Sequence, residues 1–158
     1  MTHSAPDDPL PDEANRRGYA GDIDPRRAWR LLTEDPGAVL VDVRTSAEWN
    51  FVGLPDLAEA GKQPVTIEWQ SLPAMARNPD FDARLKAALA QAQAGPETPV
   101  VFICRSGARS RDAAISCTRQ GFNRCYNLAG GFEGDLDEAR HRGQRNGWKF
   151  AGLPWRQG

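Results

Sequence analysis

The sequence predicts an α/β domain in which a mainly parallel sheet carries helices on both faces. Short runs of apolar residues, typical of strands buried on both sides, alternate along the chain with longer segments of helical periodicity. Strands that alternate with helices are typical of parallel sheets, because a helix returns the chain to the edge where the next strand begins. The length of 158 residues fits one such domain with tails, and a second catalytic domain would not fit.

The two ends of the chain differ from its middle. Residues 1–18 combine prolines with acidic side chains and offer little apolar surface to bury, so we expect a disordered N-terminal tail. Residues 19–158 are expected to form a single domain, in which residues 143–158 are an irregular C-terminal tail.

The first elements of the domain are predicted from capping and breaking residues. Asp24 followed by Pro25 indicates a helix start, since an acidic N-cap and a proline at the first helical position are both favoured there. The Pro-Gly pair at 36–37 ends this helix, and the apolar run at 39–41 predicts a buried strand. The Thr-Ser pair at 45–46 can cap a short helical turn.

The remaining elements continue the alternation. In chain order we expect a loop at 50–64, a strand at 65–67, a helix at 81–94, a strand at 99–103, a helix at 110–120, a strand at 125–128 and a last helix at 132–142. The two long helices end at Gly95-Pro96 and at Gly121, where glycine and proline break a helix or close its C-terminus.

The charge balance argues against nucleic acid or an anionic membrane as a partner. The chain has 20 basic and 21 acidic side chains and a formal net charge of -1. No stretch approaches the roughly 18 apolar residues of a membrane-spanning helix. Residues 1–15 also lack the apolar core of a secretory signal, so we expect a cytoplasmic protein.

The cysteine pattern favours a free, reactive thiol over a disulfide framework. Cys104, Cys117 and Cys125 are an odd number of cysteines with no CxxC pair, and their spacing matches no zinc-ligand set, so no metal is expected. Cys117 and Cys125 are predicted to pack in the core. The alternative is that one of them resolves a modified Cys104 by forming a disulfide with it.

The segment after the strand at 99–103 carries the candidate chemistry. It reads Cys104, Arg105, Ser106, Gly107, Ala108, Arg109, Ser110. Sites in parallel α/β sheets form beyond the carboxyl ends of strands, and Cys104 lies at such an end, just before a helix. Gly107 permits a tight curl, so the backbone N–H groups and the positive end of the helix would surround the sulfur. A thiolate there, beside Arg105 and Arg109, would be a nucleophile without a histidine base and could bind an anionic sulfur donor.

Four segments of the sequence resemble the rhodanese family. They are Val41-Asp42-Val43-Arg44 with Glu48-Trp49, the loop CRSGARS at 104–110, Gly121-Phe122 with Tyr126-Asn127-Leu128-Ala129-Gly130-Gly131, and a tail with Gly147-Trp148 and Gly152-Leu153-Pro154-Trp155. The resemblance covers about residues 19–158. It implies a rhodanese-like fold with about five strands, mostly parallel, flanked by helices on both faces, and the fifth strand would lie near residues 19–23.

The resemblance also implies a sulfurtransferase that works without a metal or organic cofactor. Cys104 would accept sulfane sulfur from a small anionic donor such as thiosulfate, as a persulfide, and pass it to cyanide, a thiol or a protein thiol in ping-pong fashion. The anion-binding loop would consist of Arg105, Ser106, Gly107, Ala108, Arg109 and Ser110. Asp42 and Arg44 would support it by organising neighbouring loops. For these two the alternative is a structural role, with Arg44 in an ion pair with Glu48.

Three alternatives and one departure accompany this interpretation. A cysteine that merely packs at a strand end would not explain the arginines that follow it. A non-catalytic rhodanese-like module that binds a partner protein is a second alternative, although this chain keeps the cysteine. A cysteine phosphatase or arsenate reductase needs an arginine six positions after the cysteine, where this chain has Ser110. The sequence departs from the usual family pattern at 52–57, where many family members have a histidine and this chain has none. The sequence leaves the oligomeric state open.

Overall fold

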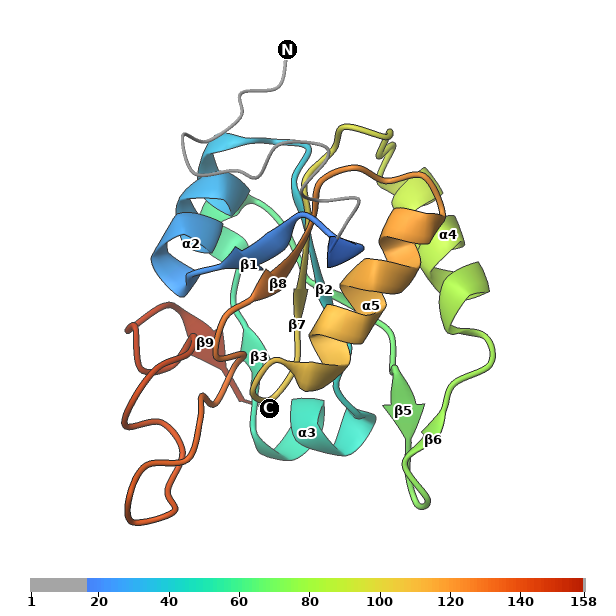
Figure 1. Cartoon of the computed structure of the whole chain (residues 1–158). Coiled ribbons are helices and arrows are strands. Elements are labelled where there is room, and N and C mark those ends of the chain that lie inside the picture. Colours follow the sequence, from blue (N-terminus) through green and yellow to red (C-terminus); the bar gives the residue numbers. More distant parts are fainter. Residues whose placement is uncertain (1–16, 158) are drawn as a thin grey trace.

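A five-stranded sheet forms the centre of the protein in a computed structural model that describes residues 17–157 (Figure 1). The strand order is β1-β8-β7-β2-β4, and every neighbouring pair is parallel. The strands are β1 (Gly21–Ile23), β2 (Val39–Asp42), β4 (Val65–Thr66), β7 (Val100–Ile103) and β8 (Cys125–Leu128). The predicted sheet of about five mostly parallel strands is confirmed, including the strand expected near residues 19–23.

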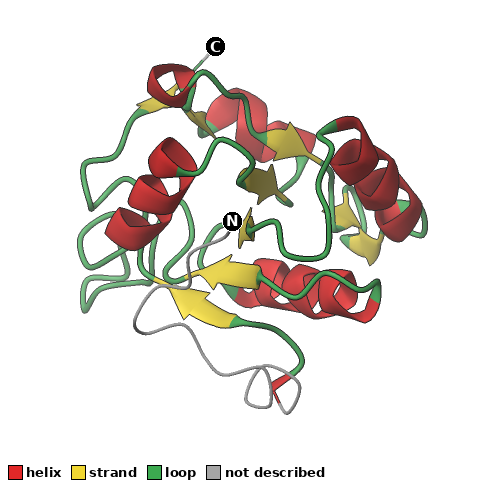
Figure 2. Ribbon diagram, turned by 90° about the horizontal axis from the view of Figure 1, so that it is seen from above, coloured by secondary structure: helices red, strands yellow, loops and turns green. Residues whose placement is uncertain are grey.

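Helices cover both faces of this sheet, as predicted. The four α-helices of the described residues are α2 (Pro25–Glu34), α3 (Ser46–Phe51), α4 (Phe81–Gln91) and α5 (Ala108–Arg119). In Figure 1 α2 lies on one side of the sheet and α4 and α5 lie on the other, and Figure 2 gives the same arrangement from above. The Asp24 carboxylate caps α2 by accepting hydrogen bonds from two backbone amides of its first turn.

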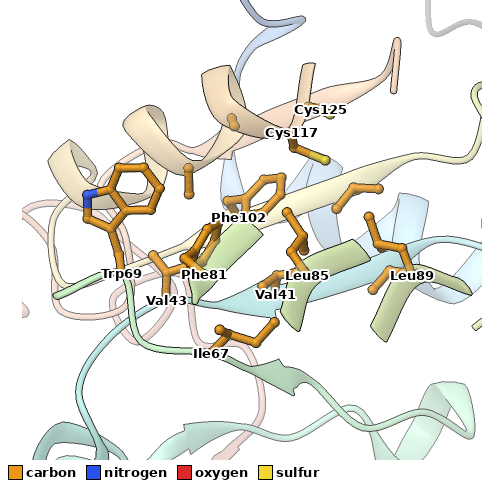
Figure 3. Packing of buried hydrophobic residues seen from close by; sticks show 14 of the residues in the cluster. Val41, Val43, Ile67, Trp69, Phe81, Leu85, Leu89, Phe102, Cys117 and Cys125 are labelled. Carbon is orange, nitrogen blue, oxygen red and sulfur yellow. The ribbon is translucent and has the colours of Figure 1, made fainter. Parts of the chain in front are cut away.

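Each face of the sheet has its own hydrophobic core. Because successive strand residues point to opposite faces, Val41 packs with the α4 and α5 cluster, while its neighbour Leu40 packs with the α2 cluster. Leu85 of α4 and Leu32 of α2 are completely buried in these two cores. Figure 3 shows the first cluster, with α4 and α5 packed over the strands. This double burial explains why the strands read as continuous apolar runs in the sequence.

Three smaller pieces of structure lie outside the main sheet. The short strand β3 (Leu54–Pro55) pairs in antiparallel fashion with β9 (Trp155–Arg156) near the end of the chain, and η1 (Ala58–Ala60) is one turn of 3₁₀ helix. The strands β5 (Gln70–Ser71) and β6 (Ala76–Arg77) form a hairpin that the sequence patterns did not predict. These pieces matter because segments near them form walls of the candidate site.

The predicted helix at 132–142 is wrong, since this segment forms turns and bends. Its first backbone amides bond to another part of the chain: Phe132 N donates to the Cys104 carbonyl and Glu133 N donates to the Arg105 carbonyl. The amide of Asp135 donates to the side-chain oxygen of Asn146. Gly134 has a φ of +85°, which a continuing right-handed helix does not allow. Tertiary hydrogen bonds therefore replace the helical ladder that the composition favours.

The ends of the chain add little to the sheet. The predicted disordered tail, residues 1–18, lies outside the described residues except for its last two positions. Residues 143–157 follow turns and bends up to β9. Within residues 17–157, no helix has the length and apolar character needed to cross a bilayer.

Candidate active site

Cys104 lies at the junction of strand β7 and helix α5, the position expected from the sequence. Helix α5 begins at Ala108, two residues earlier than predicted, and Gly107 with a φ of +124° makes the turn into it. The Cys104 Sγ accepts a hydrogen bond from the Gly107 amide at 3.1 Å and lies 3.2 Å from the Ser110 hydroxyl oxygen. The sulfur is thus held at the positive end of a twelve-residue helix. We call residues 104–110 the cysteine loop.

The carbonyl groups at the start of the cysteine loop accept hydrogen bonds from the segment after β8. The Cys104 carbonyl accepts from Phe132 N at 2.8 Å, and the Arg105 carbonyl accepts from Glu133 N at 3.0 Å and from Gly134 N at 3.3 Å. In a trans peptide the carbonyl and the N–H point in opposite directions, so the next two amides, of Arg105 and Ser106, face away from residues 132–134. Within residues 17–157, these amides have no protein acceptor.

Gly131 makes this arrangement possible by its close approach to the cysteine loop. A side-chain Cβ at this position would lie 2.6 Å from the carbonyl oxygens of Cys104 and Arg105. The φ of +64° at Gly131 also favours glycine. Gly131 is the second glycine of the YNLAGG segment, which was noted in the sequence only as part of a resemblance. The structure shows a steric reason why this position needs glycine.

A cavity of about 510 Å³ opens next to Cys104. Its walls come from the cysteine loop, from α3 and the residue after it, from the β5–β6 hairpin and from the segment after β8, and its lining residues are Glu48, Val52, Gln70, Met75, Cys104, Arg105, Ser106, Ala108, Arg109, Glu133 and Arg142. Only 1% of the surface of Cys104 is exposed to solvent, yet the residue borders this cavity. Cys104 is therefore an almost completely buried residue that still forms part of the cavity wall.

Arg109 is fixed by a two-point ion pair with Glu48 of α3. The two guanidinium nitrogens lie 2.8 and 3.0 Å from the two carboxylate oxygens. Burial by itself would raise the pKa of Glu48, but the hydrogen bonds and charge of Arg109, together with Thr45, hold that pKa below its ordinary value. Burial would likewise lower the pKa of Arg109, but Glu48 outweighs it and raises that pKa, with a smaller contribution from Cys104. The pair therefore stays ionised beside the sulfur.

Asp42 and Arg44 form a separate, fully buried ion pair that does not line the cavity. Arg44 donates from Nε and Nη2 to both oxygens of Asp42, at 2.9 and 2.6 Å, and from Nη2 to the Gly53 carbonyl at 2.7 Å. Its guanidinium lies 4.3 Å from the ring centroid of Phe132. The ion pair of Arg44 with Glu48, considered from the sequence, is wrong. Arg44 instead ties together the loop at Gly53 and the segment that begins at Phe132.

Ser110 belongs to a hydrogen-bonded chain that leads away from the sulfur. Its hydroxyl oxygen lies 2.5 Å from Asn127 Oδ1, and Asn127 Nδ2 donates to the Asp22 carboxylate at 3.0 Å. The Asp22 carboxylate can only accept hydrogen bonds, so the NH₂ group of the Asn127 side chain must point to it. The Oδ1 atom of Asn127 therefore faces Ser110. The single hydroxyl proton of Ser110 is therefore shared between the Asn127 oxygen and the sulfur of Cys104. Asn127 and Asp22 were not singled out as site residues from the sequence, although Asn127 lies in the YNLAGG segment.

The two other cysteines lie far from Cys104. In the sheet register Cys125 is the partner of Val100, four residues before Cys104 along β7, which corresponds to roughly 13 Å. A hydrogen bond with Cys125, and then burial, raise the pKa of Cys117, so it remains a neutral thiol. Figure 3 shows Cys117 and Cys125 side by side in the hydrophobic cluster. Neither can form a disulfide with Cys104 without backbone movement, since such bonds need Cα atoms within about 7 Å.

Several cavity residues were not singled out by sequence reasoning. Gln70 and Met75 come from the unpredicted hairpin, and Glu133 and Arg142 come from the segment that was expected to be a helix at 132–142. No local pattern marks them, because each reaches the cavity through long-range contacts of its segment. Among residues 17–157 there is no group of three or more His, Cys, Asp or Glu side chains that could hold a metal ion.

Comparisons with known proteins agree with this architecture. Residues 24–138 match the family described as the rhodanese-like domain. The crystal structure of Rv0390 from M. tuberculosis is similar with a TM-score of 0.78 and 48% identity, over 89% of this chain and 99% of that one. An uncharacterized protein of Rickettsia conorii is 36% identical over 129 residues, which are 82% of this chain and 91% of the relative. The thiosulfate sulfurtransferase GlpE of Actinobacillus pleuropneumoniae is 27% identical over 133 residues, 84% of this chain and 90% of the relative.

Proposed function

The chain belongs to the rhodanese-like domain family, and from this premise we propose that it is a sulfurtransferase that carries sulfane sulfur as a persulfide on Cys104. The observation that carries the proposal is the position of the Cys104 sulfur at the start of α5, beside a cavity and beside backbone amides that have no protein acceptor. The similarity to a thiosulfate sulfurtransferase supports thiosulfate as a donor. A cytoplasmic location, where thiols stay reduced, suits this chemistry.

In the first half-reaction the Cys104 thiolate attacks the outer sulfur of thiosulfate. A bond forms between Sγ and the outer sulfur, the sulfur–sulfur bond of thiosulfate breaks, and sulfite leaves with the electron pair. The enzyme then holds Cys104–Sγ–S⁻. The new terminal sulfur carries the negative charge, and the amides of Arg105 and Ser106 supply donors for it. The dipole of α5 favours the same anion.

In the second half-reaction a nucleophile such as cyanide or a thiolate attacks the terminal sulfur. The bond between Sγ and the terminal sulfur breaks, and the Cys104 thiolate is regenerated. Because the donor product leaves before the acceptor enters, the kinetics are ping-pong. The Glu48–Arg109 pair keeps a fixed positive group near the sulfur in both steps, and Asp42 and Arg44 support the loops around it.

Intact mass spectrometry tests this function. The full chain is incubated with thiosulfate, freed of excess donor and weighed, and then incubated with cyanide and weighed again. We expect a gain of one sulfur atom that cyanide removes as thiocyanate. The gain should be absent in Cys104→Ala and present in Cys117→Ala, which is the matched control. Loading of sulfur on Cys104→Ala, or none on the native chain with any sulfane donor, would refute the proposal.

The same variants separate this function from phosphatase chemistry. A phosphatase loop uses an arginine at the position that Ser110 occupies, to bind the phosphoryl oxygens at two points. Here the Ser110 hydroxyl contacts the cysteine sulfur and the Asn127 oxygen instead. We therefore expect no hydrolysis of an aryl phosphate that depends on Cys104.

A further inference from the structure

The cavity beside Cys104 is much larger than the inorganic donor needs. Its volume is about 510 Å³. Cavities of about 300–1,000 Å³ are typical of sites for organic ligands. Thiosulfate bound against the loop amides would leave most of this space to a second molecule.

Two arginines that line the cavity, Arg105 and Arg142, have no acidic partner among residues 17–157. Arg142 donates from Nη1 to the Gly134 carbonyl at 2.8 Å, and the amide of the same Gly134 donates to the Arg105 carbonyl at 3.3 Å. One glycine thus connects the Arg142 side chain to the backbone of Arg105. Within residues 17–157, neither arginine forms an ion pair, in contrast to Arg109. Both retain N–H donors that can bind a carboxylate.

The remaining walls are of mixed character. Val52 and Met75 offer apolar surface, and Gln70 offers an amide. Glu133 is the other acidic lining residue besides the paired Glu48, and it adjoins Gly134 in the chain. The cavity therefore combines a reactive sulfur, an aliphatic wall and cationic groups that are not neutralised.

We infer that this cavity binds a low-molecular-weight organic thiol that bears a carboxylate, and that this thiol is the sulfur acceptor. The inference rests on the proposed function. Arg142 holds the carboxylate, with Arg105 beside it, while the thiol sulfur points to Cys104. In the reaction R–S⁻ attacks the terminal sulfur of Cys104–Sγ–S⁻, the Sγ–S bond breaks, and R–S–S⁻ and the Cys104 thiolate result. Two anions meet in this step, and unpaired arginines lower the repulsion between them.

A matched pair of thiols tests the inference. The full chain transfers sulfur from thiosulfate to 3-mercaptopropionate or to 2-mercaptoethanol, and kcat/KM is measured for each acceptor. We expect Arg142→Gln to lower the 3-mercaptopropionate value about fivefold more than the 2-mercaptoethanol value. Since each thiol is compared between variants, its intrinsic reactivity cancels. Arg145→Gln is the control, because Arg145 is exposed and its guanidinium donates to the Leu136 carbonyl outside the cavity lining.

A second variant decides the question independently of Arg142. Glu133→Gln removes a negative charge from the cavity wall, so we expect it to raise the ratio of the two kcat/KM values in favour of 3-mercaptopropionate. A ratio that is equal in the native chain, Arg142→Gln and Glu133→Gln would overturn the inference. An equal shift in Arg145→Gln would overturn it as well. If Arg142→Gln does not fold, the rise or its absence in Glu133→Gln decides.

Failure of this inference can be told from failure of the proposed function. Loading of Cys104 by thiosulfate, followed by mass, does not require the organic acceptor. A chain that loads sulfur and passes it to both thiols without preference keeps the proposed function and loses the acceptor class. A chain that never loads sulfur loses both.

Discussion

Cys104 and the pair formed by Cys117 and Cys125 are almost equally hidden from solvent, with exposed fractions of 1%, 0% and 0%. Their surroundings are opposite. Cys104 lies at the carboxyl end of β7, contacts an amide and a hydroxyl, and borders a cavity. Cys117 and Cys125 lie toward the other end of the same sheet, in a cluster of apolar side chains. Position along the parallel sheet and the nearby polar groups therefore distinguish Cys104 from the other two cysteines, whereas the exposed fraction does not.

Alkylation of the native chain gives the largest expected difference between the two regions. We expect iodoacetate to modify Cys104 from the cavity, while Cys117 and Cys125 react only after the chain opens. Since opening of a core costs several kcal/mol, the rates should differ by at least about a thousandfold. Peptide mapping after timed alkylation measures each rate. Equal rates at the three cysteines would remove the distinction.

Two glycine substitutions test whether the backbone position of the cysteine loop determines the rate of sulfur transfer. Gly131→Ala places a Cβ 2.6 Å from the carbonyls of the cysteine loop, and Gly61→Ala, at a similar φ of +68°, places one in open space. Both variants carry the same backbone strain, of about 1–2 kcal/mol. A displacement of the loop by about 1 Å can cost a hundredfold in rate, so we expect Gly131→Ala alone to lose about that factor in sulfur transfer. Similar transfer rates in the two variants would show that the turn at Gly131 does not position the loop.

The Glu48–Arg109 pair should give the cysteine region a pH dependence that the buried pair of cysteines lacks. The pKa of Glu48 is lowered from an ordinary value of 4.5. A lowered pKa in the folded state means that the stabilisation is fully present above 4.5 and is lost as the pH falls through the lower folded value. Glu48→Gln should therefore make the free energy of unfolding less dependent on pH below 4.5 and should reduce transfer a few-fold through a less fixed Arg109. Urea unfolding at several acidic pH values measures the first effect, and an unchanged pH dependence would contradict it.

The smallest effect on sulfur transfer is expected for substitution of Cys117, one of the two cysteines buried in the hydrophobic core. Cys117→Ala removes a sulfur atom from a filled core and should lower the free energy of unfolding by about 1–2 kcal/mol. Sulfur loading on Cys104 should be unchanged. Urea unfolding and mass spectrometry give the two readouts. A loss of loading with unchanged stability would mean that Cys117 takes part in the chemistry after all.

Sequence reasoning predicted the elements that are specified locally or by double burial. The predicted strand at 125–128 has the same bounds as β8, and the cap at Asp24 starts α2 as predicted. The position of Cys104 at the end of β7 followed from the same logic, because a parallel sheet collects the carboxyl ends of its strands at one edge. The partner of Glu48 could not be found this way, since its contact with Arg109 spans 61 residues.

The parts of the site that sequence reasoning missed depend on tertiary hydrogen bonds. The segment at 132–142 has helical composition, but its amides bond to the carbonyls of Cys104 and Arg105 and to Asn146. Arg142 therefore lines the cavity instead of an exposed helix face. The β5–β6 hairpin has strands of only two residues each, too short to give a periodic pattern.

The turn at Gly131, which holds the cysteine loop, affects the order in which parts of the protein can fold. All five strands of the main sheet precede residue 129, whereas the amides that bind the Cys104 and Arg105 carbonyls belong to residues 132–134. The turn is itself held by the amide of Trp148, which donates to the Gly131 carbonyl at 2.8 Å. The strands of the sheet can therefore pair before the segment that fixes the backbone of Cys104 and Arg105 has folded. The backbone around Cys104 is therefore complete only after residues 131–148 have folded onto the sheet.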